Sequence, residues 1–421
     1  MKRNTLILIL FSAIFILFTG CSEQEGNKPL SYDPPGSTDT RDKKISLQDR
    51  RTFAFESAGV FFSNDFAGGR LNAIEQKGEQ HYSILIQPEN APINNSAWYA
   101  FKVWAAKPQR VQVELRYEDG RHRYIPKLSR DGETWQPLTP EKFSVDTTRY
   151  TALLQLDISR DTLWVAAQEL ITTAQFNRWI DGLAGKPYVS TREIGRSHMG
   201  RPIRLMEISE APDARKHVLI ISRQHPPEVT GSLAMMAFVE KIAGESALAA
   251  RFRKQFAVKV IPLMNPDGVD EGHWRHNARG VDLNRDWYNF NQPETRAARD
   301  EFLKLKDNPE NRVYFGIDFH STQEDIFYTL AKDLKTVPEG LTDRWLNKIR
   351  AHFPDYALNE DPGGLGSPVS KNWFYREFQA ASVTYESGDE SDRQALRELA
   401  AYAAEAMMET LLESISADNS Q

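Results

Sequence analysis

Four short apolar runs alternate with helical patterns in the second half of the chain, and this alternation constrains the fold more than any other feature. The runs are His217–Ser222, Ala257–Leu263, Val313–Phe319 and Ser382–Tyr385. The helical patterns lie at Val229–Ala243, Glu294–Lys306, Leu341–Ala351 and Asp392–Leu412. Short continuous apolar runs are typical of strands that helices cover on both faces. We therefore expect residues 169–415 to form an α/β layered domain.

Residues 51–168 show a different pattern, with strand-like segments and turn signals but few helical repeats. The segments are His81–Pro88, Trp98–Ala106, Arg110–Tyr117, Tyr150–Ser159 and Thr162–Ala167. This pattern predicts an all-β sandwich domain. It contains no cluster of His, Asp and Glu that indicates catalysis. Its aromatic residues are either a sugar-binding platform or, as is more usual in a sandwich, part of the core: Trp98, Tyr99, Trp104 and Trp135.

The N-terminus carries a targeting signal. Lys2 and Arg3 precede an apolar run of about 14 residues, shorter than the roughly 20 that a spanning helix needs. The stretch from Phe18 to Cys21 resembles a bacterial lipobox, which implies that residues 1–20 are a signal peptide and that Cys21 is lipidated. The alternative is an ordinary signal peptide or anchor helix with an incidental cysteine. Polar residues 21–50 read as a flexible tether.

Two further features bear on location and partners. Ser22, rather than an aspartate, follows the cysteine, which favours an exported protein anchored to the outer membrane and facing the periplasm, if the host has two membranes. Cys21 is the only cysteine, so a disulfide framework and a thiolate zinc site are excluded. A net charge of −6 gives no support for a nucleic-acid partner.

Chemistry-bearing residues follow three of the apolar runs. His225 and Glu228 come after the first run, His320 ends the third, and Glu386 ends the fourth. Ligands in open α/β sheets gather at the carboxyl ends of strands, so these residues point to one cleft. Two histidines and one carboxylate with an open position are the arrangement of catalytic zinc. Taken alone, His225 and Glu228 are more often a solvated pair on a loop.

The segment from Trp274 to Trp287 adds polar groups that can recognise a carboxylate. It contains Arg275, Asn284 and Arg285, and it follows the turn sequence Asn265-Pro266-Asp267-Gly268. An arginine presents a planar fork to a carboxylate, and an asparagine adds neutral hydrogen bonds. The alternative is that these are surface arginines beside an ordinary turn.

The order of these motifs resembles the M14 family of zinc carboxypeptidases over about residues 170–415. The motifs are H-x-x-E, NPDG, W-R, G-V-D-L-N-R, H-S and T-Y-E-S. Residues 51–168 resemble, more loosely, the N-terminal β-domain of the cytosolic-carboxypeptidase branch. The resemblance implies a mixed sheet flanked by helices and preceded by the all-β sandwich.

The resemblance also implies roles for individual residues. His225, Glu228 and His320 match the ligands of one Zn²⁺ ion, and Glu386 matches the glutamate that moves protons. Four further matches concern the substrate and the outer ligand sphere. Arg275 matches the arginine that stabilises the oxyanion, and Asn284 and Arg285 match the pair that binds the terminal carboxylate. Asp282 matches the aspartate that orients the first histidine, here His225.

Three positions depart from, or extend, the family pattern. Residues 360–367 contain no tyrosine where the family has one that caps the substrate, and Tyr356 and Tyr375 fit poorly. Pro227 stands where many digestive members have an arginine that contacts long peptides. Lys371 matches the family position at the base of the specificity pocket, and the resemblance therefore implies a preference for an acidic C-terminal residue; the alternative is a surface lysine.

The sequence thus predicts an enzyme, a zinc-dependent carboxypeptidase that hydrolyses a peptide bond next to a free C-terminal carboxylate. Two alternatives stay open on the same site. One is a cell-wall peptide amidase or endopeptidase, or a deacylase of N-acyl amino acids. The other is a non-catalytic binding lipoprotein that keeps the fold.

Overall fold

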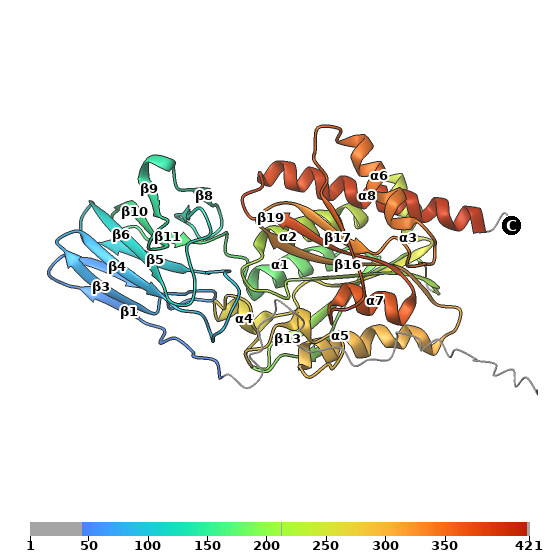
Figure 1. The fold of residues 1–421 in the computed structure, drawn as a ribbon, viewed down its shortest axis with the longest axis horizontal. Coiled ribbons are helices and arrows are strands. Elements are labelled where there is room, and N and C mark those ends of the chain that lie inside the picture. Colours follow the sequence, from blue (N-terminus) through green and yellow to red (C-terminus); the bar gives the residue numbers. More distant parts are fainter. Residues whose placement is uncertain (1–43, 212, 419–421) are drawn as a thin grey trace, which may run out of the picture.

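The structure is a computed structural model that describes residues 44–418 except residue 212. It consists of a β-rich N-terminal unit and an α/β unit that lie side by side (Figure 1). The predicted signal peptide, Cys21 and most of the predicted tether lie outside the described residues. Within residues 44–418, no helix is long and apolar enough to cross a membrane.

The N-terminal unit contains two sheets packed face to face. The six-stranded sheet has the order β1 (Thr52–Phe55), β2 (Val60–Ser63), β5 (Ala100–Ala105), β11 (Leu163–Ala166), β7 (Lys127–Ser129) and β8 (Gln136–Pro137). The five-stranded sheet has the order β3 (Ala73–Gly78), β4 (His81–Ile86), β6 (Gln109–Tyr117), β10 (Thr151–Ile158) and β9 (Phe143–Asp146), with a short 3-10 turn, η2 (Pro140–Lys142), before β9. Alternate residues of β6, such as Val111 and Val113, are buried between the sheets. This alternation confirms the predicted all-β fold.

The aromatic residues of this unit belong mainly to its core. Trp98 and Tyr99 are buried, and the indole Nε1 of Trp98 donates to the carbonyl of Gly68 at 2.8 Å. Trp104 stacks on Phe61 with ring centroids 5.6 Å apart. A sugar platform built from Trp98 and Tyr99 is therefore wrong, because their rings face the interior.

The α/β unit is built on one eight-stranded mixed sheet. Its order is β12 (Val189–Arg196), β13 (Pro202–Ile208), β15 (Phe256–Ile261), β14 (Lys216–Ser222), β16 (Arg312–Thr322), β19 (Ala381–Gly388), β17 (Ile326–Leu330) and β18 (Glu360–Gly363). The four central strands, β15, β14, β16 and β19, are parallel, whereas β13 and β17 join them antiparallel. These observations confirm the predicted fold class.

Helices cover both faces of this sheet (Figure 1). On one side lie α2 (Val229–Ile242), α3 (Ala247–Arg253), α6 (Leu341–His352) and α8 (Arg393–Asp418); on the other lie α5 (Pro293–Leu303) and α7 (Ser370–Phe378). The remaining elements of the unit are α1 (Thr173–Ala184), α4 (Pro266–Asp270), η3 (Leu283–Arg285) and η4 (Lys304–Asp307).

Strand β14 shows why the central runs are continuously apolar. Val218 and Ile220 belong to the hydrophobic cluster under α2 and α8, whereas Leu219 and Ile221 belong to the cluster under α5 and α7. Since successive side chains of a strand point to opposite faces of the sheet, odd-numbered and even-numbered residues must both be apolar when helices cover both faces. The same geometry places the carboxyl ends of β14, β16 and β19 along one edge of the sheet.

Candidate active site

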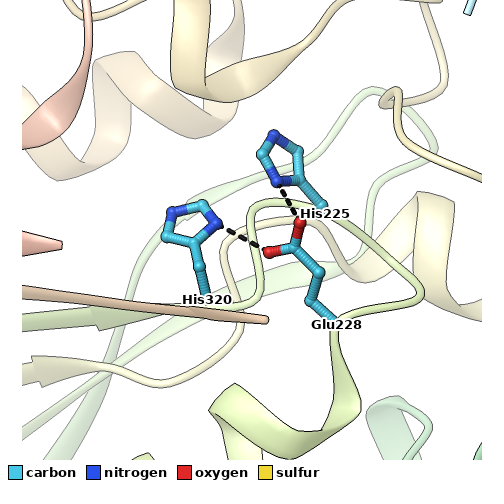
Figure 2. Close-up of side chains that lie close together, drawn as sticks. All are labelled: His225, Glu228 and His320. Atoms are coloured by element: carbon cyan, nitrogen blue, oxygen red, sulfur yellow. Dashed lines mark hydrogen bonds and ion pairs between the residues drawn. The ribbon is translucent and has the colours of Figure 1, made fainter. Parts of the chain in front are cut away.

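Three side chains converge at this edge to form a candidate metal centre. The Nδ1 atom of His225 lies 2.8 Å from Oε1 of Glu228, and Nδ1 of His320 lies 2.7 Å from Oε2 of the same carboxylate (Figure 2). One ligand atom from each residue lies within 4.8 Å of the others, and all three residues are buried. The structure thus brings together the three residues that the sequence predicted as ligands.

The loop after β14 places His225 and Glu228 at this point. Arg223 adopts the left-handed backbone conformation, with φ of 57°, and so turns the chain sharply out of the strand. Its buried guanidinium donates to the carbonyl of Pro226 at 2.8 Å and to Ser232 Oγ at 3.1 Å, which fixes the loop. Glu228 occupies the N-cap position of helix α2, with its side chain turned to the two histidines instead of the helix amides. The first turn of that helix packs directly on the backbone of His320, where a Cβ on Gly231 would clash.

Each histidine contacts a second carboxylate with its other ring nitrogen. His225 Nε2 lies 2.8 Å from Asp282 Oδ1, and His320 Nε2 lies 2.8 Å from Asp318 Oδ2. Because a neutral imidazole carries one N–H, it cannot donate to carboxylates at both nitrogens. A cation held at the two Nδ1 atoms and Glu228 resolves this conflict, since each Nε2–H then donates to its aspartate. The residues present therefore fit a zinc ion.

The charges in this cluster support the same interpretation. Burial would raise the pKa of Glu228, but His225 and His320 outweigh it and hold that pKa well below its usual range. Burial would lower the pKa of His320, but Asp318 and Glu228 raise it well above its ordinary value. The buried carboxylates of the cluster therefore favour a positive charge between them, and a divalent ion supplies that charge.

Asp318 is a functional residue that the sequence prediction missed. It lies within β16, two residues before His320, and also accepts from Gln224 Nε2 at 2.6 Å and from Ser370 Oγ. An aspartate inside a run of buried apolar residues is the signal that could have identified it, because a buried carboxylate needs partners.

Glu386 lies at the end of β19, directly opposite His320 in the parallel register. Burial and the neighbouring Glu228 carboxylate raise its pKa to about 7. Its Oε2 atom has no hydrogen-bond partner among the described residues. A carboxyl group with a pKa near neutral pH and a free oxygen is suited to accept and return a proton.

The segment after α4 supplies the polar groups predicted to contact the substrate. Arg275 Nε donates to Asp282 Oδ2 at 2.8 Å, so one aspartate holds both this arginine and His225. The backbone N–H of Asn284 donates to Asp282 Oδ1 at 2.8 Å. In Asp282, burial would raise the pKa, but Arg275 and His225 lower it well below its ordinary value.

These residues line one cleft with a volume of about 550 Å³. Its walls include His225, Glu228, Arg275, Asn284, Arg285, Lys371 and Glu386. Lys371 is buried on α7, and its Nζ donates to the carbonyl of Thr329 at 2.6 Å. Burial lowers the pKa of Lys371 to about 8, against the attraction of Asp361. It is therefore a wall residue of the cleft and not a surface lysine.

Two contributions to the cleft were not predicted. Tyr328 lines it from β17, the strand antiparallel to β19, whereas Tyr356 instead donates to Asp325 at 3.0 Å. The N-terminal unit contributes a wall that includes Asn95 and Arg123. Neither contribution carries a local motif, because each depends on contacts between distant parts of the chain.

Comparison with known proteins gives the family. Residues 176–409 match the profile of the zinc carboxypeptidases, peptidase family M14, and residues 62–167 match the cytosolic carboxypeptidase N-terminal domain. An uncharacterised protein of Zymomonas mobilis is 28% identical over 341 residues, which cover 76% of this chain and 86% of that protein. Cytosolic carboxypeptidase 6 of Mus musculus is 25% identical over 286 residues, which cover 62% of this chain and about half, 53%, of the mouse protein.

Solved structures show the same fold. A metallo-carboxypeptidase from Burkholderia cenocepacia aligns with a TM-score of 0.69 at 19% identity, covering 85% of this chain and 99% of that one. A metallo-carboxypeptidase from Pseudomonas aeruginosa, in complex with (2-guanidinoethylmercapto)succinic acid, aligns with a TM-score of 0.66 at 19% identity, covering 85% of this chain and 99% of that one. The predicted family is therefore confirmed: this chain belongs to the M14 zinc carboxypeptidases, and it is a metallocarboxypeptidase with a cytosolic-carboxypeptidase-type N-terminal domain.

Proposed function

We propose that this carboxypeptidase uses one Zn²⁺ ion, held by His225, Glu228 and His320, to release C-terminal residues, with a preference for acidic ones. The convergence of both histidine Nδ1 atoms on the Glu228 carboxylate, with Glu386 directly opposite His320, is the observation that carries this proposal. When bound there, Zn²⁺ supplies a Lewis acid that acidifies water and polarises the scissile carbonyl.

The side chains of the cleft then have distinct roles. Glu386 takes a proton from the attacking water at its free carboxylate oxygen and gives it to the nitrogen of the leaving residue. Arg275, held by Asp282, stabilises the negative charge that develops on the carbonyl oxygen. Asn284 and Arg285 hold the terminal carboxylate of the substrate, which places the last peptide bond beside Glu386.

The preference for acidic residues rests on Lys371. Its ammonium group is buried in the cleft wall and is paired with a carbonyl oxygen rather than with a carboxylate. A terminal glutamate or aspartate would bring the missing opposite charge, whereas an apolar side chain would leave the ammonium uncompensated.

A substrate panel tests this function. Purified protein is assayed on peptides that end in Glu, Asp, Leu or Lys, on their C-terminally amidated counterparts, on muropeptides and on N-acyl amino acids. We expect release of single residues from free C-termini only, fastest for Glu and Asp, and no release by Glu386→Gln. Turnover of muropeptides or acyl amino acids alone would favour the amidase or deacylase alternative. No turnover of any substrate by zinc-loaded protein would favour a binding protein.

We also propose that the enzyme is exported and anchored to a bacterial membrane through a lipid on Cys21, leaning toward the outer membrane. The pattern of residues 1–21 supports this proposal. Metabolic labelling with an alkyne fatty acid tests it: the wild type should be labelled and membrane-bound, and Cys21→Ser should be unlabelled and soluble. Equal labelling of both proteins would refute it.

A further inference from the structure

The backbone segment that carries Arg275 is held by a carboxylate from the N-terminal unit. Glu89 accepts three backbone N–H groups of this segment, from Trp274 at 2.7 Å, from Arg275 at 3.0 Å and from His276 at 2.6 Å. The Glu89 side chain is completely inaccessible to solvent. Hydrogen bonds to an ionised acceptor are stronger than neutral ones, and here three consecutive amides share one carboxylate.

Burying such a carboxylate is costly unless its surroundings compensate the charge. Burial would raise the pKa of Glu89, but His273, His276 and Arg70, together with the amide of His276, lower it to about 2. Glu89 is therefore ionised at neutral pH. Glu89 and Arg275 are 186 residues apart in the sequence. Apolar packing would join the two units with a smaller desolvation penalty, so a buried charge at this contact indicates a specific role.

Other groups of the N-terminal unit hold the same segment. Asn90 Oδ1 lies 2.6 Å from His276 Nδ1, and the carbonyl of Trp98 accepts from the Trp274 indole at 3.1 Å. A Cβ on Gly120 would lie 2.5 Å from the Trp274 ring, so a turn of the β-unit packs against this indole without space for a side chain. The segment is thus fixed at its backbone and on both flanking side chains.

The fixed segment leads directly to the proposed metal centre. Arg275 Nε contacts Asp282 Oδ2 at 2.8 Å, and Asp282 Oδ1 contacts His225 Nε2 at 2.8 Å. The guanidinium of Arg275 is tied to the metal side by Asp282, while its backbone is tied to the N-terminal unit by Glu89. Glu89 and Asp282 thus hold the two ends of the same residue, its backbone N–H and its guanidinium.

We propose that Glu89 is a positioning residue for catalysis, through which the N-terminal β-sandwich sets the place of Arg275 in the cleft. This inference rests on the oxyanion role proposed above for Arg275. Misplacing a catalytic group by about 1 Å can cost on the order of a hundredfold in rate. Glu89→Gln keeps the shape of the side chain, but it removes the charge and turns an N–H donor toward the backbone amides.

A double-mutant cycle on the zinc-loaded full chain tests the proposal. In the otherwise wild-type enzyme, Glu89→Gln should lower kcat by about tenfold to a hundredfold with little change in KM. In the Arg275→Ala background the same substitution should change kcat less than about twofold, because the group it positions is absent. Glu169→Gln is the matched control: Glu169 lies in the segment that joins the two units and also pairs with an arginine of the α/β unit, Arg393, at 2.8 Å, but it does not contact the Arg275 segment. It should leave kcat unchanged.

Several results would overturn the proposal. An equal loss in both backgrounds would mean that Glu89 supports the fold in general, and loss of bound zinc in Glu89→Gln would place its effect on the metal centre. If Glu89→Gln does not fold, Glu89→Asp, which keeps the charge but is one methylene shorter, goes through the same cycle with the same expected outcomes. An inactive wild type would instead refute the proposed function, which distinguishes the two failures.

Discussion

Replacing Lys371 by methionine should make the protein more stable and less selective at the same time. Lys371 is a buried ammonium whose pKa is displaced from 10.5 to about 8, mainly by burial. Since a pKa shift of one unit corresponds to about 1.4 kcal/mol, keeping Lys371 charged in the folded protein costs roughly 3 kcal/mol. Methionine removes that cost but also the hydrogen bond to Thr329, worth about 1 kcal/mol. The expected net gain at pH 7 is about 2 kcal/mol.

The gain should depend on pH in a defined direction. Between the folded pKa of about 8 and the unfolded value of 10.5, the folded protein binds fewer protons at Lys371 than the unfolded chain does. Stability of the wild type therefore rises with pH across this window. The advantage of Lys371→Met is largest below about pH 8 and reverses to a deficit of about 1 kcal/mol above about pH 10.5, where only the lost hydrogen bond to Thr329 remains. Urea unfolding followed by tryptophan fluorescence at pH 7 and pH 10.5 measures both differences.

Selectivity should change in the opposite direction. A charged hydrogen bond between Lys371 and a terminal carboxylate side chain contributes about 1.5–3 kcal/mol, or roughly tenfold to a hundredfold in kcat/KM for Glu over Leu. Lys371→Met should bring this ratio close to one. Lys348→Met should leave it unchanged, because Lys348 lies on α6 and pairs with Glu409 and Glu413 of α8 rather than lining the cleft. In the wild type the ratio should fall as the pH rises above about 8. A Lys371→Met enzyme that is less stable and still prefers Glu would refute this reasoning.

Three further changes have direct readouts. Asp318→Asn removes the charge that faces His320 Nε2 and should weaken zinc binding by about tenfold to a hundredfold, measured by competition with a chromogenic chelator; unchanged affinity would contradict its orienting role. Arg285→Met should raise KM for peptides with a free C-terminus by about tenfold to a hundredfold without altering zinc content, and an unchanged KM would place the terminal carboxylate elsewhere. Trp98→Ala should cost about 3–5 kcal/mol of stability, measured by urea unfolding, whereas a cost below about 1 kcal/mol would mean that this indole is not part of the core.

Much of the site could be predicted because its residues follow strands. His225, His320 and Glu386 each come after or end an apolar run, and parallel strands bring such ends together without any detail of packing. The central strands and the main helices were predictable for the same reason, since their apolar periodicity reflects burial. Strand β12, by contrast, has largely exposed polar residues at the sheet edge and carries no apolar run.

The remaining site residues depend on contacts that local sequence does not encode. Asp318 interrupts the apolar pattern of β16, but the sequence alone does not show that its partner is the Nε2 atom of His320. Tyr328 reaches the cleft because β17 pairs antiparallel with β19. Glu89 meets the Arg275 segment across the boundary between two units, so no spacing along the chain relates them.

Zinc titration of the chelator-treated enzyme tests the central claim most directly. Activity on a peptide with a C-terminal glutamate should be lost on chelation and should return in proportion to added Zn²⁺, reaching its maximum at one equivalent per chain. His320→Ala should bind zinc weakly and recover little activity. Full activity without zinc, or full recovery in His320→Ala, would contradict a catalytic zinc held by His225, Glu228 and His320.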